Sequence, residues 1–243
     1  MSTTPDDFYF LDPAGSDRLL AIPEENPSPT GNDWTPCPAG ARLENNHAQC
    51  VTQPGDEHLD RTWNVRVRHN QRDQDLIWTS PPWQFVVVHD RLIAALKAEG
   101  FSGYSLRPAT VRFRDGSLSH DYKRLLVTGW GGLASPESGV GLAWACPGCL
   151  LKTYTPLVDA GALIDRSQWT GEDFFVVWPM PGAVLVTGRV AEFLRSSGTK
   201  SLTLRVLDKE TKSHGRAGFG VGSLGDTFPR ALALKYGGRL GIV

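Results

Sequence analysis

The chain has 243 residues, of which 40% are hydrophobic and 21% charged, the composition of a globular protein with one large or two small domains. Its formal net charge of −1 favours neither nucleic acid nor an anionic membrane surface as a partner. No apolar run approaches the ~18 residues of a transmembrane helix, and the N-terminus lacks the basic and apolar regions of a secretory signal, so we expect a cytoplasmic protein.

The N-terminal part of the chain predicts few regular elements. Residues 8–11 predict a short strand, whereas 23–60 are rich in Pro, Gly, Asn and charged residues and predict a long irregular segment. Residues 63–68 alternate in period two, as in a half-buried strand. Residues 83–88 are apolar on both faces near their end, which predicts a central strand.

A strand–helix–strand pattern then begins. Residues 89–100 carry apolar side chains at the spacing of one helix face, with Asp90 placed as the N-cap and Gly100 as the residue that ends the helix. A strand at 104–107 follows.

The same pattern recurs 98 residues later, so that Arg91 aligns with Arg189 and Gly100 with Gly198. The second copy predicts strands at 174–178 and 183–186, a helix at 189–198 and a strand at 201–206. We interpret the pattern as a duplication that forms either one pseudo-twofold domain or twin lobes. The alternative is two independent units that share ordinary helix signals.

Glycine marks the segments between and after the copies. Residues 125–132 and 139–144 predict strands interrupted by glycine, and 230–236 predict a short closing helix in a tail that is otherwise loop. The predicted fold class is therefore α+β, with mixed sheets, two similar strand–helix–strand units and long loops. The chain forms either a single domain, 1–243, or two lobes, 1–124 and 125–243.

The four cysteines are the most specific chemical signal. Cys146 and Cys149 enclose a Pro-Gly turn, the spacing that lets two thiolates converge on one tetrahedral metal ion. Cys37 and Cys50 could complete a structural zinc site, with His47 as an alternative ligand. The other interpretations are free thiols, a disulfide or, less in keeping with the extended sequence after Cys149, a thioredoxin-like redox motif.

Other residue types predict binding more than catalysis. The six histidines are scattered and form no metal-binding pair at helical spacing, and the glycine-rich stretches do not match a phosphate loop. Tryptophan beside arginine is typical of protein-binding hot spots. Trp34, Trp78 and Trp169 lie in polar stretches, which predict either partial exposure for binding or, alternatively, packing under long loops. The candidate partner contacts are Arg66, Arg68, Arg72, Trp78 and Trp83, with the tail near Phe219 as a further region.

The order of these elements resembles the double-CxxCG family of myxobacteria and related bacteria, which includes immunity proteins of the SitI type. The resemblance covers roughly residues 8 to 208, and its most specific part is the motif that contains Cys146 and Cys149. The first motif, at Cys37, is degenerate because Gly40 stands at its second cysteine, and Leu150 replaces the final glycine of the second motif. The tail after residue 208 lies outside the resemblance.

The resemblance implies a cytoplasmic antitoxin that binds a cognate toxin protein and neutralises it by covering its active surface. Such a protein needs no catalysis, and zinc would be structural. One rival is a zinc-dependent or thiol redox enzyme that uses Cys146 and Cys149. A second rival, a nucleic-acid-binding zinc ribbon, is disfavoured by the near-neutral charge.

Overall fold

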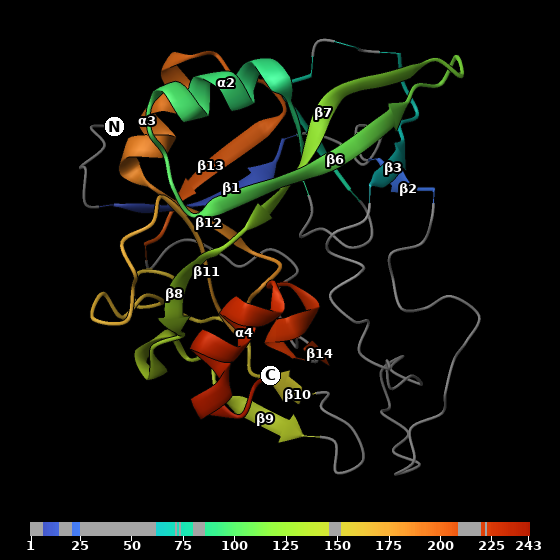
Figure 1. Ribbon diagram of the computed structural model, residues 1–243. Helices are drawn as coiled ribbons and strands as arrows, with labels where there is room; N and C mark the ends of the chain where they lie inside the picture. Colours follow the sequence, from blue (N-terminus) through green and yellow to red (C-terminus); the bar gives the residue numbers. More distant parts are fainter. Residues whose placement is uncertain are drawn as a thin grey trace, which may run out of the picture.

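Three β-sheets and the helices packed on them make up the described part of the protein (Figure 1). The computed structural model describes residues 7–14, 21–24, 62–70, 72, 74–79, 86–145, 152–208, 220–221 and 223–243. The sheets combine parallel and antiparallel pairs, so the fold is α+β, as the sequence predicts. Most of the predicted irregular segment, 23–60, lies outside the described residues.

The strands and α-helices follow one another along the chain, with short 3₁₀ turns between some of them. The strands are β1 Phe8–Pro13, β2 Ile22–Pro23, β3 Trp63–Arg66, β4 Leu76–Trp78, β5 Val86–His89, β6 Tyr104–Arg112, β7 Leu118–Val127, β8 Gly129–Leu133, β9 Leu142–Ala145, β10 Lys152–Tyr154, β11 Phe174–Trp178, β12 Val184–Thr187, β13 Leu202–Val206 and β14 Gly220–Val221. The helices are α2 Asp90–Ala98, α3 Gly188–Ser196 and α4 Arg230–Gly237, and the 3₁₀ turns are η2 Pro136–Ser138, η3 Leu224–Asp226 and η4 Gly238–Leu240.

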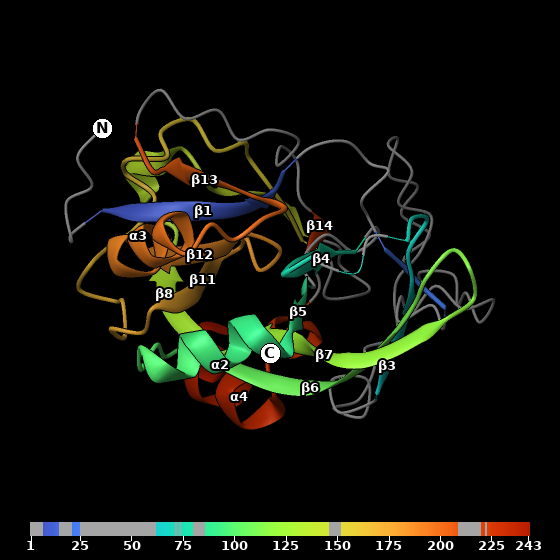
Figure 2. The same ribbon diagram turned by 90° about the horizontal axis from the view of Figure 1, so that it is seen from above.

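The six-stranded sheet closes on itself. Its order is β2-β3-β6-β7-β5-β4, and Ala21, which precedes β2, forms a bridge with Thr79 after β4. The Ala21 amide donates to the carbonyl of Trp78 at 2.7 Å, which joins the two edges of the sheet. Figure 2 shows β6 and β7 curving away from α2 toward β3. The sheet is thus a small barrel, and a buried cluster that includes Trp63, Val65 and Tyr122 lies on one of its faces.

The predicted strand–helix–strand pattern occurs twice in the fold. Strand β5 and helix α2 have the same lengths as β12 and α3 at the offset of 98, so Val86 corresponds to Val184 and Asp90 to Gly188. The preceding strands match too: Leu76 pairs with Val88 in the first repeat, and Phe174 with Val186 in the second. We refer to β4-β5-α2-β6 as the first repeat and β11-β12-α3-β13 as the second repeat.

In each repeat, a strand from outside the repeat lies between its two parallel strands and pairs antiparallel with both. In the first repeat this central strand is β7, which pairs with both β5 and β6. In the second repeat it is β1, which pairs with both β12 and β13. The two units therefore have one topology, but β7 directly follows its repeat whereas β1 comes from the far N-terminal side of the chain.

One core joins the repeats. Helices α2 and α3 lie at the same end of the molecule (Figure 1), and corresponding side chains from both repeats enter a single buried cluster. The corresponding pairs in this cluster are Leu76 and Phe174, Val86 and Val184, Val88 and Val186, Leu92 and Val190, Ile93 and Ala191, and Leu96 and Leu194. The two repeats therefore share one buried cluster and do not have separate cores.

The helix ends follow the sequence with one correction. Gly100 and Gly198 have φ of +70° and +66°, the left-handed conformation that ends a helix. The N-cap of α2 is His89, not Asp90: the Nδ1 atom of His89 accepts from the Arg91 amide at 3.1 Å. Asp90 is the first helical residue, where its negative charge still favours the helix dipole.

The C-terminal tail contributes to another buried cluster on the five-stranded sheet. Helix α4, predicted at 230–236, is present at Arg230–Gly237. Tyr236 stacks on Trp130 of β8, with ring centroids 5.3 Å apart, and Phe228 meets the same indole edge-on. The described part of the tail is therefore anchored to the sheet by aromatic contacts.

The two-lobe division at 124/125 does not match the strands. It falls inside β7, and it separates β1 from the strands β12 and β13 that β1 joins. The single-domain alternative fits this interleaving. Within the described residues, no helix has the length and apolar character needed to cross a membrane.

Candidate functional site

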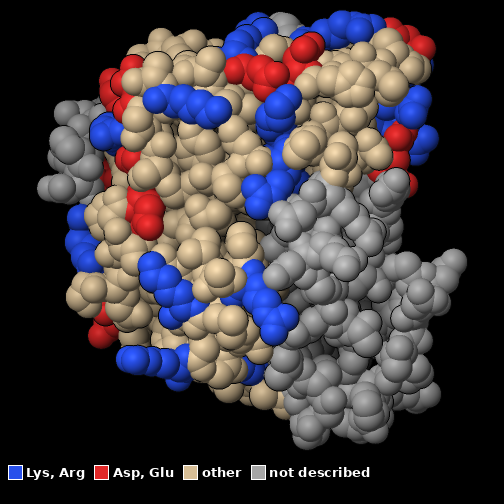
Figure 3. All heavy atoms as spheres, viewed as in Figure 1, with Lys and Arg blue, Asp and Glu red and all other residues tan. Residues whose placement is uncertain are grey.

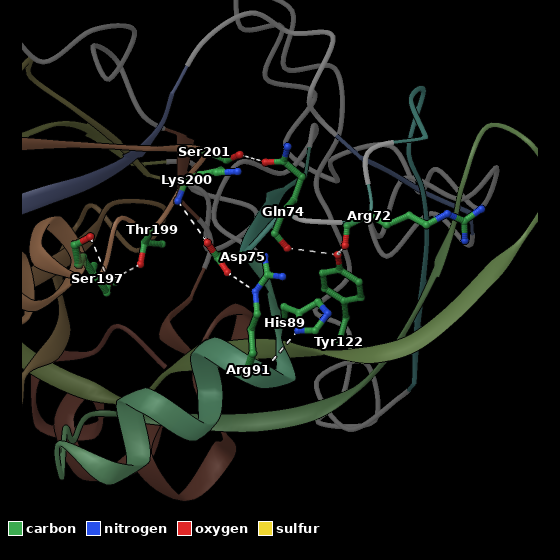
Figure 4. Close-up of polar contacts among 11 residues, drawn as sticks. Arg72, Gln74, Asp75, His89, Arg91, Tyr122, Ser197, Thr199, Lys200 and Ser201 are labelled. Carbon is green, nitrogen blue, oxygen red and sulfur yellow. Dashed lines mark hydrogen bonds and ion pairs between the residues drawn. The ribbon is translucent and has the colours of Figure 1, made fainter.

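A polar junction lies where the first repeat meets the turn after α3 (Figure 4). Asp75, just before β4, accepts from Nε of Arg91 at 2.6 Å through one carboxylate oxygen. The other oxygen accepts from the backbone amide of Lys200 at 3.3 Å. The carboxylate thus links the start of α2 to the turn that leaves α3.

The second repeat has a matching junction. Asp173, which corresponds to Asp75, accepts from the Ser102 amide at 3.0 Å, and Ser102 corresponds to Lys200. Arg189, which corresponds to Arg91, lies 3.7 Å from the Asp173 carboxylate. Each repeat therefore holds the turn after the other repeat's helix, and the two junctions form a reciprocal clamp.

Neighbouring groups complete the first junction. The Ser201 hydroxyl donates to the side-chain oxygen of Gln74, and the Tyr122 hydroxyl donates to the Gln74 carbonyl at 3.2 Å. The His89 ring meets the Tyr122 ring edge-on, with centroids 4.8 Å apart. His89 is thus engaged as a helix cap and Asp75 as an ion-pair partner. The junction positions α2 and the turn at Lys200, which is a structural role.

A buried arginine is the main charged group on the barrel face that carries Trp63. Arg124 of β7 is fully buried, and its guanidinium lies 4.6 Å from the centroid of the Trp63 ring. Burial, and then the nearby charge of Arg107, lower the pKa of Arg124 to about 10. Arg107 is the cross-strand partner of Arg124, so two arginine side chains start from the same face of the barrel.

The predicted partner contacts have different environments. Arg66 and Arg68 are exposed, and Arg72 is exposed but forms an ion pair with Asp115 at 2.7 Å. The prediction for Trp78 is wrong: its side chain is 4% exposed, and its indole donates to the Ser201 carbonyl at 3.0 Å. Trp78 belongs to the shared core because β4 of the first repeat brings this side chain to Ser201, just before β13 of the second repeat. Trp34, Trp83 and Phe219 lie outside the described residues.

Trp169 follows the prediction of partial exposure more closely. It is half-buried, and its ring packs against Phe8, with centroids 5.0 Å apart.

The predicted zinc ligands cannot be compared with the fold. Cys37, His47, Cys50, Cys146 and Cys149 all lie outside the described residues. Residues 146–151 connect β9 to β10, and these strands pair with Ala145 opposite Lys152. Within the part of the chain that the structure describes, no three His, Cys, Asp or Glu residues group together as a metal site.

A surface outside the predicted contacts lies at residues 230–240 of the C-terminal tail. The outer side of α4 and η4 exposes Leu234 by 51% and Leu240 by 45%, alongside three basic residues. This surface, the C-terminal basic face, comprises Arg230, Leu234, Lys235, Arg239 and Leu240. Figure 3 shows basic side chains with few acidic ones over this lower part of the molecule.

The sequence contained a signal for this face. Residues 227–243 carry three basic residues and no Asp or Glu, and leucines lie next to two of those basic residues. On the inner side of the helix, Ala233 and Gly237 are buried against the tail cluster, which fixes the outward direction of Leu234 and Lys235.

Comparisons with known proteins do not assign a family. No protein-family model matches the chain, and no curated protein matches it at a significant level.

Proposed function

We propose that this protein is a cytoplasmic immunity protein that binds a cognate bacterial toxin and neutralises it by covering the toxin's active surface. The layout of residues 8 to 208, with Cys146 and Cys149 in one motif, supports the proposal through its resemblance to the double-CxxCG family. The protein acts by direct binding and performs no reaction on the toxin.

The C-terminal basic face is the observation that carries the proposal. Solvent-exposed leucines cost free energy in water, and burying them against a partner recovers it at about 25 cal/mol per Å². The surrounding Arg230, Lys235 and Arg239 favour a partner with acidic groups around an apolar patch. Complementary charge would speed association, and the leucines would then be desolvated at the centre of the contact.

One helix face is smaller than a complete interface. A tight inhibitor buries on the order of 1,600 Å² in total with its target. The contact therefore extends beyond α4 and η4. Lys152 of β10 is the nearest candidate for this extension, because its Nζ donates to the Gly241 carbonyl at 3.2 Å, immediately after η4.

Zinc has a structural role in this proposal. Four thiolates from Cys37, Cys50, Cys146 and Cys149, or three with His47, would close a tetrahedral site without an open position for substrate. The pairing of Ala145 with Lys152 supports this role, because it brings together the two ends of the segment that contains Cys146 and Cys149. The partner-binding role of Arg66 and Arg68, both exposed, remains part of the proposal as a second contact region.

The test is co-expression with the protein encoded immediately upstream of this chain. We expect that protein to stop growth when expressed alone and to be tolerated when the chain is present. Leu234→Asp and Lys235→Glu should raise the dissociation constant of the purified pair at least about tenfold, by loss of apolar and charged contact. Leu118→Asp is the matched control, because Leu118 is 49% exposed on β7. An upstream product that is harmless or unbound contradicts the proposal, as does binding that Leu234→Asp leaves unchanged.

The same system separates binding from the enzyme alternative, which uses Cys146 and Cys149. With a structural site, Cys149→Ser lowers the melting temperature, and protection from the toxin falls only as far as folding does. A folded Cys149→Ser protein that binds the toxin normally but no longer protects would instead support thiol or zinc chemistry.

A further inference from the structure

Four arginines lie on the outer face of the barrel, on the neighbouring strands β3 and β6. Arg66 ends β3 and Arg68 follows it, whereas Arg112 ends β6 and Arg114 follows it. The side chains between them belong to the buried barrel cluster, so the arginines alternate with the core and face outward. Figure 1 shows β3 beside the end of β6. We refer to these four residues as the arginine face.

The two strands hold these arginines side by side. Arg66 is opposite Arg112 in the parallel pair, and neighbouring strands lie about 4.8 Å apart. The amide of Arg114 donates to the His69 carbonyl at 3.3 Å, which keeps the chain after β6 beside the segment that carries Arg68. Like charges this close repel one another, so the arrangement costs free energy while the face contacts only water. An anionic partner would offset that repulsion.

One carboxylate already binds to this face. Glu24, which follows β2, accepts from Nε of Arg112 at 2.7 Å. The other three arginines are exposed, and none of them forms an ion pair with another residue that the structure describes. The ion pair of Glu24 shows which chemical group the face accepts, and three guanidinium groups are left to bind further groups of that kind.

We propose that the arginine face binds an extended acidic segment of a partner protein. In an extended segment, alternate side chains lie on one side and are about 6.6 Å apart, which is also the spacing from Arg66 to Arg68 and from Arg112 to Arg114 along an extended chain. Guanidinium groups bind carboxylates through paired, charge-assisted hydrogen bonds. The proposal rests on the proposed function for the identity of the partner, since the segment would belong to the toxin.

The face suits carboxylates better than it suits nucleic acid. Single-stranded nucleic acids bind where aromatic side chains stack on their bases. The aromatic residues on these two segments, Trp63 and Phe113, are 3% and 2% exposed and point into the barrel cluster. The net charge of −1 also gives the whole protein little long-range attraction for a polyanion.

Acidic residues limit the face on the side of β7. Asp115 and Asp121 are exposed, and Asp115 pairs with Arg72 at 2.7 Å, so Arg72 is not part of the face. These carboxylates would repel an acidic segment from the β6–β7 hairpin. The contact therefore follows β3 and β6 and does not continue over β7.

The experiment is fluorescence anisotropy with the purified full chain, at concentrations up to about 100 µM, and a labelled peptide of alternating Glu and Ser. We expect this peptide to bind, more weakly as salt is added, and the same peptide with Gln in place of Glu not to bind. Arg66→Glu combined with Arg114→Glu should raise the dissociation constant at least about tenfold. Lys235→Glu combined with Arg239→Glu makes the same change in charge on the C-terminal basic face and should leave the affinity within about twofold.

Three outcomes would overturn the proposal. They are no binding of the Glu peptide, binding that the control pair weakens but Arg66→Glu with Arg114→Glu does not, and tighter binding of a labelled single-stranded oligonucleotide at the same salt concentration. Circular dichroism and the melting temperature show whether the variants are folded, as expected for exposed positions.

The upstream product separates this proposal from the proposed function. A chain that protects from the toxin but does not bind the Glu peptide would contradict only the arginine face. A chain that binds the peptide through Arg66 and Arg114 but does not bind the upstream product would contradict the immunity role and leave the arginine face as a site for another acidic protein.

Discussion

The two repeats share one topology but obtain their central strand in opposite ways. Strand β7 turns back directly from β6, so the first repeat is built from neighbouring segments of the chain. Strand β1 pairs Tyr9 with Val206 and Leu11 with Leu204, across almost the whole chain. The final topology therefore does not require the central strand to be close in sequence to its neighbours. The order in which the two repeats fold, however, should depend on that sequence separation.

The repeats also differ at the turn after each helix. Gly103 and Ser201 correspond in position and both have positive φ, +86° and +68°. A Cβ atom at Gly103 would lie 2.0 Å from the Phe174 carbonyl oxygen, whereas Ser201 already has a side chain, whose hydroxyl contacts Gln74. The clamp is therefore tighter where the turn of the first repeat meets β11.

The largest expected effect on stability comes from substitutions at these two turn positions. Gly103→Ala should destabilise the protein by about 3 kcal/mol or more, because backbone atoms must move and the alanine is held at positive φ. Ser201→Gly should change stability by no more than about 1 kcal/mol, since relief of positive φ offsets the lost hydroxyl bond. Urea unfolding measures both. Equal losses in the two variants would show that the two turns are equally tight.

Two central-strand leucines test the folding order. Leu11 of β1 and Leu125 of β7 are both 3% exposed in the shared core, so truncation to alanine should cost about 2–5 kcal/mol in each case. Stopped-flow kinetics should show that Leu125→Ala slows folding, whereas Leu11→Ala mainly speeds unfolding. Reversed kinetics would mean that the long-range pairing of β1 forms first.

The reciprocal clamp predicts that removing its two carboxylates lowers stability by unequal amounts. Asp173 accepts from the amide and hydroxyl of Ser102 and from the Thr187 hydroxyl, whereas Asp75 accepts from Arg91 and one backbone amide. Asp173→Ala should therefore cost about 2–3 kcal/mol and Asp75→Ala about 1–2 kcal/mol.

Salt should reduce the loss of stability in Asp75→Ala more than the loss in Asp173→Ala. The reason is that Arg91 is 49% exposed and only 2.6 Å from Asp75, whereas Arg189 is 3.7 Å from Asp173. Asp121→Ala, on an exposed stretch of β7, is the control and should be nearly neutral. A smaller loss for Asp173→Ala than for Asp75→Ala would contradict this account of the clamp.

The smallest expected effect is a pH dependence next to the barrel of the first repeat. Burial lowers the pKa of His69 below its ordinary value of 6.5. Below pH 6.5 the unfolded chain therefore binds more protons at this residue than the folded chain does, so stability falls as the pH drops through the folded pKa. Urea unfolding between about pH 7.5 and pH 5.5 should show a smaller acid loss in His69→Gln than in the unmodified protein. An identical acid loss in both would assign it to other groups.

Local signals in the sequence predicted much of the repeats. The sequence predicts the helix ends at Gly100 and Gly198, and also the offset of 98 between the copies. Both depend only on neighbouring residues. The long strand β7 was predicted only from residue 125, because Ser119, His120, Asp121 and Lys123 give it a polar appearance before its buried end. Its fully buried Arg124 strengthens that appearance.

Contacts between segments that are distant in the sequence could not be predicted from it. The insertion of β1 into the second repeat and the closure of the barrel through Ala21 join segments that share no sequence pattern. The burial of Trp78 follows from its position between the repeats, whereas its polar neighbours in the sequence indicated exposure. The C-terminal basic face was visible as charge and leucine spacing, but its outward direction required the contacts of Ala233 and Gly237.

Strand β1 has a consequence for how the protein is made and how it could be divided. It leaves the ribosome well before β12 and β13, the strands on either side of it, so the five-stranded sheet is incomplete until nearly all of the chain has been synthesised. A chain that lacks residues 7–14 would have a gap in the middle of that sheet. We expect a separate peptide with this sequence to fill the gap and to restore the fold of the larger piece.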